Sequence, residues 1–273
     1  MSNNHLGKSP VPAASWRFQE QGRGPALLLL HGLGASAFSW RDNLGPLAAK
    51  FRLLAPDVPP HGASPAPLNG DYRLETLVQG LHDFLDLRGV DQAVVGGNSL
   101  GGSLALLLAH YFPERVKALI LLAPGLAVDR LPWITYPLRA PVLGRLLAYL
   151  MGPWTIPYAL RLAYHRWDRI TPKVIEGYAA PFRDRSRRLA LRQLALALRP
   201  WPRAEVEALL RQLPQPACLI WGEQDRILPP AQSEILRHCL PRCEFHLLPE
   251  VGHAPQEEAP ERVNQIILDF LGG

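Results

Sequence analysis

Short apolar runs alternate with longer stretches whose apolar residues recur every three or four positions, and this alternation constrains the fold more than any other feature of the chain. The apolar runs cover residues 25–32, 51–57, 92–99, 116–125, 217–225 and 244–253. They end in Gly, Pro or polar residues, which is typical of strands buried on both faces of a parallel sheet. The stretches 74–90 and 100–115 have the spacing of crossover helices. Together these patterns predict a doubly wound α/β fold with a mostly parallel sheet.

The alternation is interrupted between residues 126 and 213. This segment has no convincing strand, contains nine prolines and four of the seven tryptophans, and includes several helix-like pieces. We therefore expect a helical cap, residues 126–213, inserted between two strands of a core formed by residues 1–125 and 214–273. Fourteen Arg and one Lys against six acidic residues give the cap a charge of +9, whereas the rest of the chain is −4.

A serine flanked by glycines stands at one predicted strand-to-helix turn. Ser99 lies in "GGNSLGG", where a buried strand should end and a helix begin, with Gly97 and Gly101 two residues to either side. The pattern G-x-S-x-G at such a turn leaves the serine hydroxyl exposed at the carboxyl edge of the sheet. Small neighbours are needed there because the strand and the helix nearly touch. The alternative interpretation of Ser99 is a helix N-cap.

A serine hydroxyl needs a base within hydrogen-bond reach, and the base needs an acid to orient it. Asp225 follows one late apolar run and His253 follows the next. Loops that leave parallel strands lie at the same edge of a sheet, so both side chains should lie near Ser99. Asp129, which follows the strand predicted to end at Gly125, is the alternative acid.

The chain resembles the α/β-hydrolase fold superfamily from about residue 16 to its end. The matching segments are "HGLG", "PDVPPHGAS", "GNSLGG", "WGEQD" and "VGHAPQEEAPERV". The resemblance implies that Ser99 is the nucleophile, His253 the base and Asp225 the orienting acid. It also implies an oxyanion hole formed by the backbone N–H groups of Leu33 and Leu100.

One segment departs from the family's pattern. Pro60 stands in "PPHGAS" where members commonly have a glycine, which leaves the shape of that loop open. His31 and His61 belong to recurring loop motifs, and we expect them to pack or to form hydrogen bonds rather than to transfer protons.

Three residues are candidates for substrate contact. Asn98 precedes the predicted nucleophile and is either a substrate contact or simply a compact polar residue at the turn. Trp133 and Trp154 lie in the predicted cap, where pocket lining and ordinary core packing are the alternatives.

These observations predict a serine hydrolase that cleaves carboxylic esters of apolar acyl or alcohol groups and requires no metal or organic cofactor. The alternative is a carbon–carbon bond hydrolase acting on ring meta-cleavage products, because "GNSLGG" resembles the nucleophile turn of those enzymes. Ala254 and Pro255 weaken that resemblance, since those enzymes usually carry a tryptophan after the histidine. A third interpretation is a non-catalytic ligand-binding protein on the same scaffold, because a fold alone does not give a function.

The sequence composition limits which binding partners and which cellular location we expect for this protein. The chain starts without the apolar core of a secretory signal, so a cytoplasmic location is expected. The three cysteines form no CxxC pair, which argues against a structural zinc site, and no apolar run reaches 18 residues. A small-molecule ester is the expected partner, and nucleic acid is not expected. For the basic cap, the alternatives are a solvated arginine-rich surface and a weak contact with an anionic membrane surface.

Overall fold

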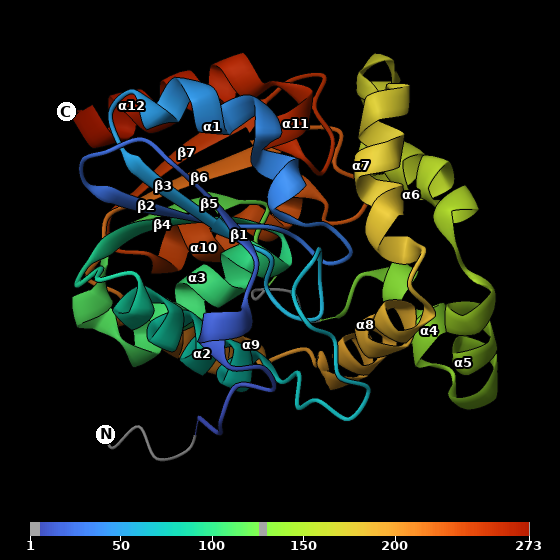
Figure 1. Cartoon of the computed structure of the whole chain (residues 1–273). Coiled ribbons are helices and arrows are strands. Elements are labelled where there is room, and N and C mark those ends of the chain that lie inside the picture. Colours follow the sequence, from blue (N-terminus) through green and yellow to red (C-terminus); the bar gives the residue numbers. More distant parts are fainter. Residues whose placement is uncertain (1–5, 126–129, 273) are drawn as a thin grey trace.

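The computed structural model describes residues 6–125 and 130–272, which form a seven-stranded sheet with helices on both faces (Figure 1). The strand order is β1-β3-β2-β4-β5-β6-β7. The strands are β1 (Phe18–Gln21), β2 (Ala26–Leu30), β3 (Arg52–Pro56), β4 (Ala93–Asn98), β5 (Val116–Leu122), β6 (Ala217–Gly222) and β7 (Cys243–Leu248). The doubly wound, mostly parallel sheet predicted from the sequence is thus confirmed.

Strands β2 to β7 pair in parallel and coincide, to within a few residues, with the six predicted apolar runs. β1 was not predicted. It pairs antiparallel with β3 at the edge of the sheet, and its sequence "FQEQ" is mostly polar and exposed. An edge strand that faces solvent carries no apolar run, so hydrophobic patterning does not reveal it.

The helices of the core form a layer on each face of the sheet (Figure 1). α1 (Arg41–Ala48) and α12 (Pro260–Gly272) cover one face. α2 (Leu74–Leu87), α3 (Leu100–Tyr111) and α10 (Ser233–Cys239) cover the other. The short helix α11 (Pro255–Glu258) precedes α12, and the 3-10 turns of the core are η1 (Ala13–Ser15), η2 (Ala37–Trp40), η3 (Pro113–Arg115) and η7 (Pro230–Gln232).

The core follows from the alternation of side chains along each strand. In β2, Leu28 and Leu30 pack toward α2 and α3, whereas Leu27 and Leu29 pack toward α1 and α12. Both sets are fully buried, which explains why the strand is a continuous apolar run rather than an alternating one. α3 is buried over ten of its twelve residues, because it packs between the sheet and the neighbouring helices.

A second group of helices lies beside the carboxyl edge of the sheet, at the right of Figure 1. It consists of α4 (Tyr136–Arg139), α5 (Pro141–Leu150), α6 (Ile156–Ala163), α7 (Pro172–Phe182) and α8 (Arg185–Ala197), with the turns η4 (Trp133–Thr135), η5 (Pro153–Thr155) and η6 (Trp167–Arg169). These helices form the inserted cap. α9 (Arg203–Arg211) falls within the expected cap range 126–213, but its apolar side chains join the core cluster that includes α10. No helix in the described part of the chain is long and apolar enough to cross a membrane.

Candidate active site

Ser99 lies between the end of β4 and the first residue of α3, in a backbone conformation that few side chains adopt. Its φ is 53° and its ψ is −114°. A positive φ is unfavourable for a residue with a Cβ, so the surrounding structure must hold the turn in place. Part of that support is the Ser99 N–H, which donates to the carbonyl of Leu122 on β5 at 2.9 Å.

The glycines around Ser99 are explained by close approach of the backbone. A Cβ at Gly97 would lie 2.3 Å from the backbone of Gly101, and a Cβ at Gly101 would lie 2.2 Å from the carbonyl oxygen of Leu30. The strand, the turn and the helix therefore touch through main-chain atoms. No larger residue fits at either position without moving β2 or α3.

Asp225 and His253 follow the neighbouring strands β6 and β7 and form a hydrogen-bonded pair. The Nδ1 of His253 lies 2.7 Å from Oδ2 of Asp225. The other carboxylate oxygen of Asp225 accepts from the backbone N–H groups of Ile227 and Leu228 at 2.9 and 2.8 Å. A carboxylate held in this way keeps the proton on Nδ1, which leaves Nε2 of His253 free to act as a base.

Three sets of hydrogen bonds fix the position of the loop that carries His253. The Nδ2 of Asn98 donates to the carbonyl of His253 at 3.0 Å and to that of Leu122 at 3.1 Å. The N–H of His253 donates to the carbonyl of Ala163, at the end of α6 in the cap, at 2.8 Å. The position of His253 therefore depends on both the core and the cap.

Glu258 provides the third attachment of this loop. Its fully buried carboxylate accepts from the backbone N–H groups of Gly252, Ala254, His165 and Arg166 at 2.7–3.3 Å. Burial raises the pKa of Glu258, although these four donors oppose the shift. One side chain thus joins the His253 loop to the segment that follows α6.

Leu33 and Leu100, the predicted oxyanion-hole residues, lie beside Ser99 in the structure. Both line the same pocket as Ser99, Leu33 after β2 and Leu100 as the first residue of α3. Within the described part of the chain, neither N–H donates to a backbone carbonyl in the surrounding turns and loops. The N-terminus of a helix also carries a partial positive charge, which favours an anion at this point.

His31 and His61 hold the loops that follow β2 and β3 through hydrogen bonds to the backbone. His31 accepts from the Val58 N–H at Nε2 (3.0 Å), and its Nδ1 donates to the carbonyl of Gly32 (2.9 Å). His61 donates from Nδ1 to the carbonyl of Val58 at 2.8 Å, and the two rings stack edge to face. Burial lowers the pKa of both imidazoles, and the neighbouring His31 lowers the pKa of His61 further. Neither side chain lines the pocket that contains Ser99.

The loop that contains Pro60 has a defined conformation, and the Pro59–Pro60 peptide bond in it is cis. The carboxylate of Asp57 accepts from the N–H groups of Ala37 and Ala63 at 2.8 and 2.7 Å. Gly62, with φ of 54°, packs directly against this carboxylate. Asp57 therefore joins this loop to the segment that follows β2.

Ser99 and His253 open into one pocket of about 230 Å³ between the sheet and the cap. Most of its walls are aliphatic or aromatic. The cap contributes, among others, Ile134, Ile156, Leu160, Phe182 and Leu198. Within the described residues, no group of three or more His, Cys, Asp or Glu side chains is arranged to hold a metal ion. The site is suited to binding an apolar molecule beside the hydroxyl of Ser99.

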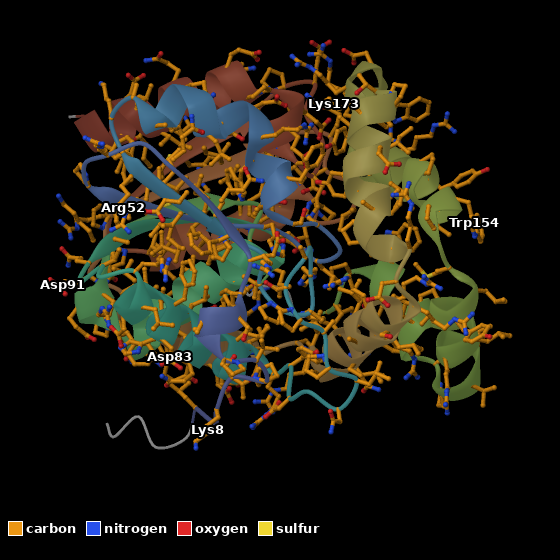
Figure 2. The ribbon with its side chains drawn as sticks, viewed as in Figure 1. Lys8, Arg52, Asp83, Asp91, Trp154 and Lys173 are labelled. Atoms are coloured by element: carbon orange, nitrogen blue, oxygen red, sulfur yellow. The ribbon has the colours of Figure 1, made fainter. Side chains whose placement is uncertain are left out.

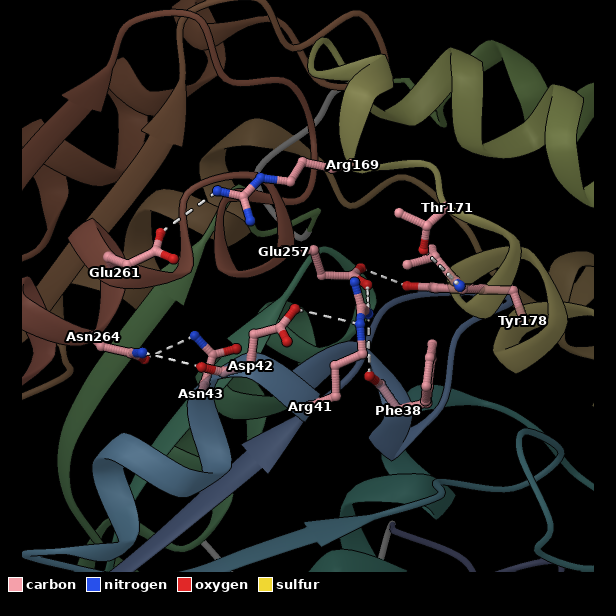
Figure 3. Close-up of polar contacts among 11 residues, drawn as sticks. Phe38, Arg41, Asp42, Asn43, Arg169, Thr171, Tyr178, Glu257, Glu261 and Asn264 are labelled. Carbon is pink, nitrogen blue, oxygen red and sulfur yellow. Dashed lines mark hydrogen bonds and ion pairs between the residues drawn. The ribbon is translucent and has the colours of Figure 1, made fainter.

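A buried polar cluster forms one wall of this pocket (Figure 3). Glu257 on α11 forms an ion pair with Arg41 on α1 and accepts from the hydroxyl of Tyr178 on α7 at 2.5 Å. Burial raises the pKa of Glu257, and burial beside this carboxylate raises the pKa of the hydroxyls of Tyr178 and Tyr164. The hydroxyl of Tyr164 has no hydrogen-bond partner of normal geometry among the described residues.

Residue patterns did not identify this cluster, because its members lie far apart in the sequence. Trp201, which also lines the pocket, was not singled out either. Trp133 and Trp154, by contrast, are more than half exposed and do not line it. The donors of Asn98 are taken up by two backbone carbonyls, although its side chain borders the pocket. Asp129 lies outside the described residues.

Comparisons with known proteins agree with this architecture. The profile of the alpha/beta hydrolase fold family matches residues 25–260. The uncharacterised hydrolase YugF of Bacillus subtilis is 30% identical over 93% of this chain and 92% of its own length. The 2-hydroxymuconate semialdehyde hydrolase of Pseudomonas putida is 30% identical over 96% of this chain and 92% of its own length. A solved structure of a thermophilic esterase from Thermogutta terrifontis is 27% identical, with a TM-score of 0.80 over 94% of this chain and 93% of that one.

Proposed function

Because the chain belongs to the α/β-hydrolase fold family, we propose that it is a serine hydrolase that cleaves carboxylic esters with apolar acyl or alcohol groups. The observation that carries the proposal is the apolar pocket into which both Ser99 and His253 open. Supporting evidence comes from the hydrogen bond between His253 and Asp225 and from the similarity to an esterase of known structure.

In the proposed mechanism, Ser99 attacks the ester carbonyl while His253 takes up the hydroxyl proton at Nε2. Asp225 keeps the imidazole oriented and stabilises the imidazolium. The N–H groups of Leu33 and Leu100 bind the oxyanion, and loss of one such donor typically costs about 10²–10³ in rate. His253 then gives the proton to the leaving alcohol, and a water molecule hydrolyses the acyl-enzyme by the same steps.

The charged groups of the pocket favour a neutral substrate. Arg199 is the one arginine among the described lining residues, and its side chain is 75% exposed and lies 3.6 Å from Glu75. The half-buried Arg41 is already paired with Glu257, which lines the pocket. An anionic substrate would thus meet the Glu257 carboxylate without a free buried cation to balance its charge.

Carbon–carbon bond hydrolysis is the second candidate, and it is supported by the similarity to the Pseudomonas putida semialdehyde hydrolase. The two reactions share the nucleophile and the oxyanion hole, so the triad does not separate them. They differ in whether the pocket must bind a carboxylate beside a conjugated chain.

Turnover of p-nitrophenyl esters of increasing acyl length, compared with turnover of a ring-cleavage dienoate, tests this proposal. We expect kcat/KM to be higher for the esters and to rise with acyl length until the pocket is filled, because each buried methylene contributes about 0.8 kcal/mol. Ser99→Ala serves as the control for background hydrolysis. A dienoate preference would reverse the order of the two candidates. Failure of a fluorophosphonate to label Ser99 would rule out both candidate reactions.

A further inference from the structure

The outward side of the cap exposes an unusual number of large apolar side chains, which we call the outer cap surface. They lie on α5, η5 and α6 and are between 42% and 81% exposed. The residues are Val142, Leu143, Leu146, Tyr149, Leu150, Trp154, Tyr158 and Leu162. Trp154 points away from the molecule at the outer edge of the cap (Figure 2). Large apolar side chains that are exposed as a group, rather than singly, usually mark an interaction site.

The packing of α5 explains why these side chains face outward. The residues that α5 buries are the two small ones, Gly144 and Ala148. A Cβ at Gly144 would lie 2.2 Å from the carbonyl oxygen of Leu138, so α5 approaches the preceding segment through its small residues. The large apolar residues of α5 are thereby left on the opposite face. The outer cap surface is therefore a consequence of how the cap is built, not of one misplaced side chain.

The charge of this part of the cap is of one sign. Residues 130–167 contain five arginines and no Asp or Glu. Arg145 on α5 and Arg161 on α6 are exposed, and neither forms an ion pair with a described residue. Arg185 lies over the ring of Tyr149 at 4.1 Å and adds a third cation at the same surface.

The arginine-rich run 183–188 contributes less free charge than its composition suggests. Arg183 forms an ion pair with Glu176. Arg187 donates to the carbonyls of Pro60, His61 and Ser64, and Arg188 donates to carbonyls within the cap. Most of these guanidinium groups hold the cap in place. Of this run, Arg185 is the residue that adds a cation at the outer cap surface.

We propose that the outer cap surface binds the interface of an anionic phospholipid membrane. Trp and Tyr are favoured at the headgroup level, and a helical surface with exposed Leu and Arg binds in the plane of the interface. A second copy of the chain fits less well, because two such surfaces face to face would bring arginines together without an acidic partner.

This surface lies directly behind the wall of the catalytic pocket. On α6, Ile156 and Leu160 line the pocket, whereas Tyr158 and Leu162 are exposed on the other side. Near the pocket, Trp133 is exposed between Pro132 and Ile134, which both line it. The outer cap surface and the pocket thus lie on opposite sides of α6. The proposal concerns binding and holds whichever reaction the site performs.

Co-sedimentation of the 273-residue chain with vesicles tests the proposal without any measurement of turnover. We expect binding to vesicles of phosphatidylcholine mixed with phosphatidylglycerol and much weaker binding to phosphatidylcholine alone. Combining Arg145→Glu with Arg161→Glu should weaken binding at least about tenfold, because each basic residue near an anionic surface contributes about a fivefold factor. Val142→Asp and Trp154→Ala should weaken it by removing apolar contact.

Matched controls lie on the core. Arg23→Glu combined with Arg262→Glu makes the same change of charge at two exposed sites, and Leu87→Asp places a carboxylate at an exposed leucine of α2. Both controls should bind like the unaltered protein. Absence of binding to the mixed vesicles overturns the proposal, and so does equal loss in the control variants. A dimer in light scattering that Val142→Asp dissociates, without vesicle binding, would assign this surface to a second copy instead.

Discussion

The side-chain amide of Asn98 lies 3.0 Å from the main-chain carbonyl of His253, although the two residues are 155 positions apart in the sequence. This hydrogen bond joins the residue before the proposed nucleophile to the proposed base. A second bond from the same amide reaches β5. The turn at the end of β4 and the loop after β7 are thus positioned relative to each other by one side chain.

Replacing Asn98 should therefore affect rate more than binding. Asn98→Ala removes two hydrogen bonds that hold the His253 loop, and a displacement of about 1 Å at a catalytic group can cost about 10²-fold in rate. We expect kcat for a p-nitrophenyl ester to fall by about 10- to 100-fold, with little change in KM. Asn98→Asp should be worse, because a carboxylate would face two carbonyl oxygens. A raised KM with unchanged kcat would instead make Asn98 a substrate contact.

The proposed acid is tested by a matched pair of substitutions. Asp225→Asn removes the charge that holds the imidazole in its working tautomer, and the loss of kcat in such cases reaches about 10⁴-fold. Asp129→Asn, the alternative acid from the sequence, should leave kcat nearly unchanged. Steady-state kinetics of both variants, with circular dichroism to check folding, decides between them. If Asp129→Asn lost kcat and Asp225→Asn kept it, Asp129 would be the residue that orients His253.

His61 makes stability depend on pH. Its pKa lies well below the ordinary value because of burial, the neighbouring His31 and the charge of Arg187, so the folded chain holds the imidazole neutral. The unfolded chain binds a proton below about pH 6.5. This contribution to stability is therefore complete above that pH and is lost as the pH falls below it.

His61→Asn keeps a donor for the carbonyl of Val58 but cannot titrate. Between about pH 5 and about pH 6.5 the free energy of unfolding should fall less steeply for the variant, by up to about 1.4 kcal/mol per pH unit. Urea unfolding at several pH values measures both slopes. Identical slopes would mean that His61 is protonated in the folded protein.

Arg187 should matter to the attachment of the cap. Its guanidinium donates to three carbonyls of the loop from Pro60 to Ser64, at 2.7–3.2 Å. Arg187→Ala leaves those part-buried acceptors without this donor, so we expect a loss of about 1–3 kcal/mol in unfolding free energy and faster proteolysis within the cap. Arg183→Ala, which removes only an exposed ion pair with Glu176, should cost less than about 1 kcal/mol. Equal losses in both variants would contradict this role for Arg187.

The sequence by itself determined the sheet, the insertion and the order of the proposed triad. The apolar runs indicated the buried strands because a strand covered on both faces must be apolar throughout. The glycines around Ser99 indicated a tight turn because only a residue without a Cβ fits there. Parallel strands then place the loops of Ser99, Asp225 and His253 at one edge, so no tertiary information was needed to bring these residues together.

Tertiary structure alone decided the contacts between elements that no local pattern relates. The cluster of Arg41, Tyr178 and Glu257 draws on three helices, and its residues look unremarkable in the sequence. The outward direction of Trp154 depends on the way the cap packs, since the same residue type is also common in cores. Periodicity specifies which face of a helix is apolar, but the neighbouring helices decide whether that face becomes core, pocket wall or exposed surface.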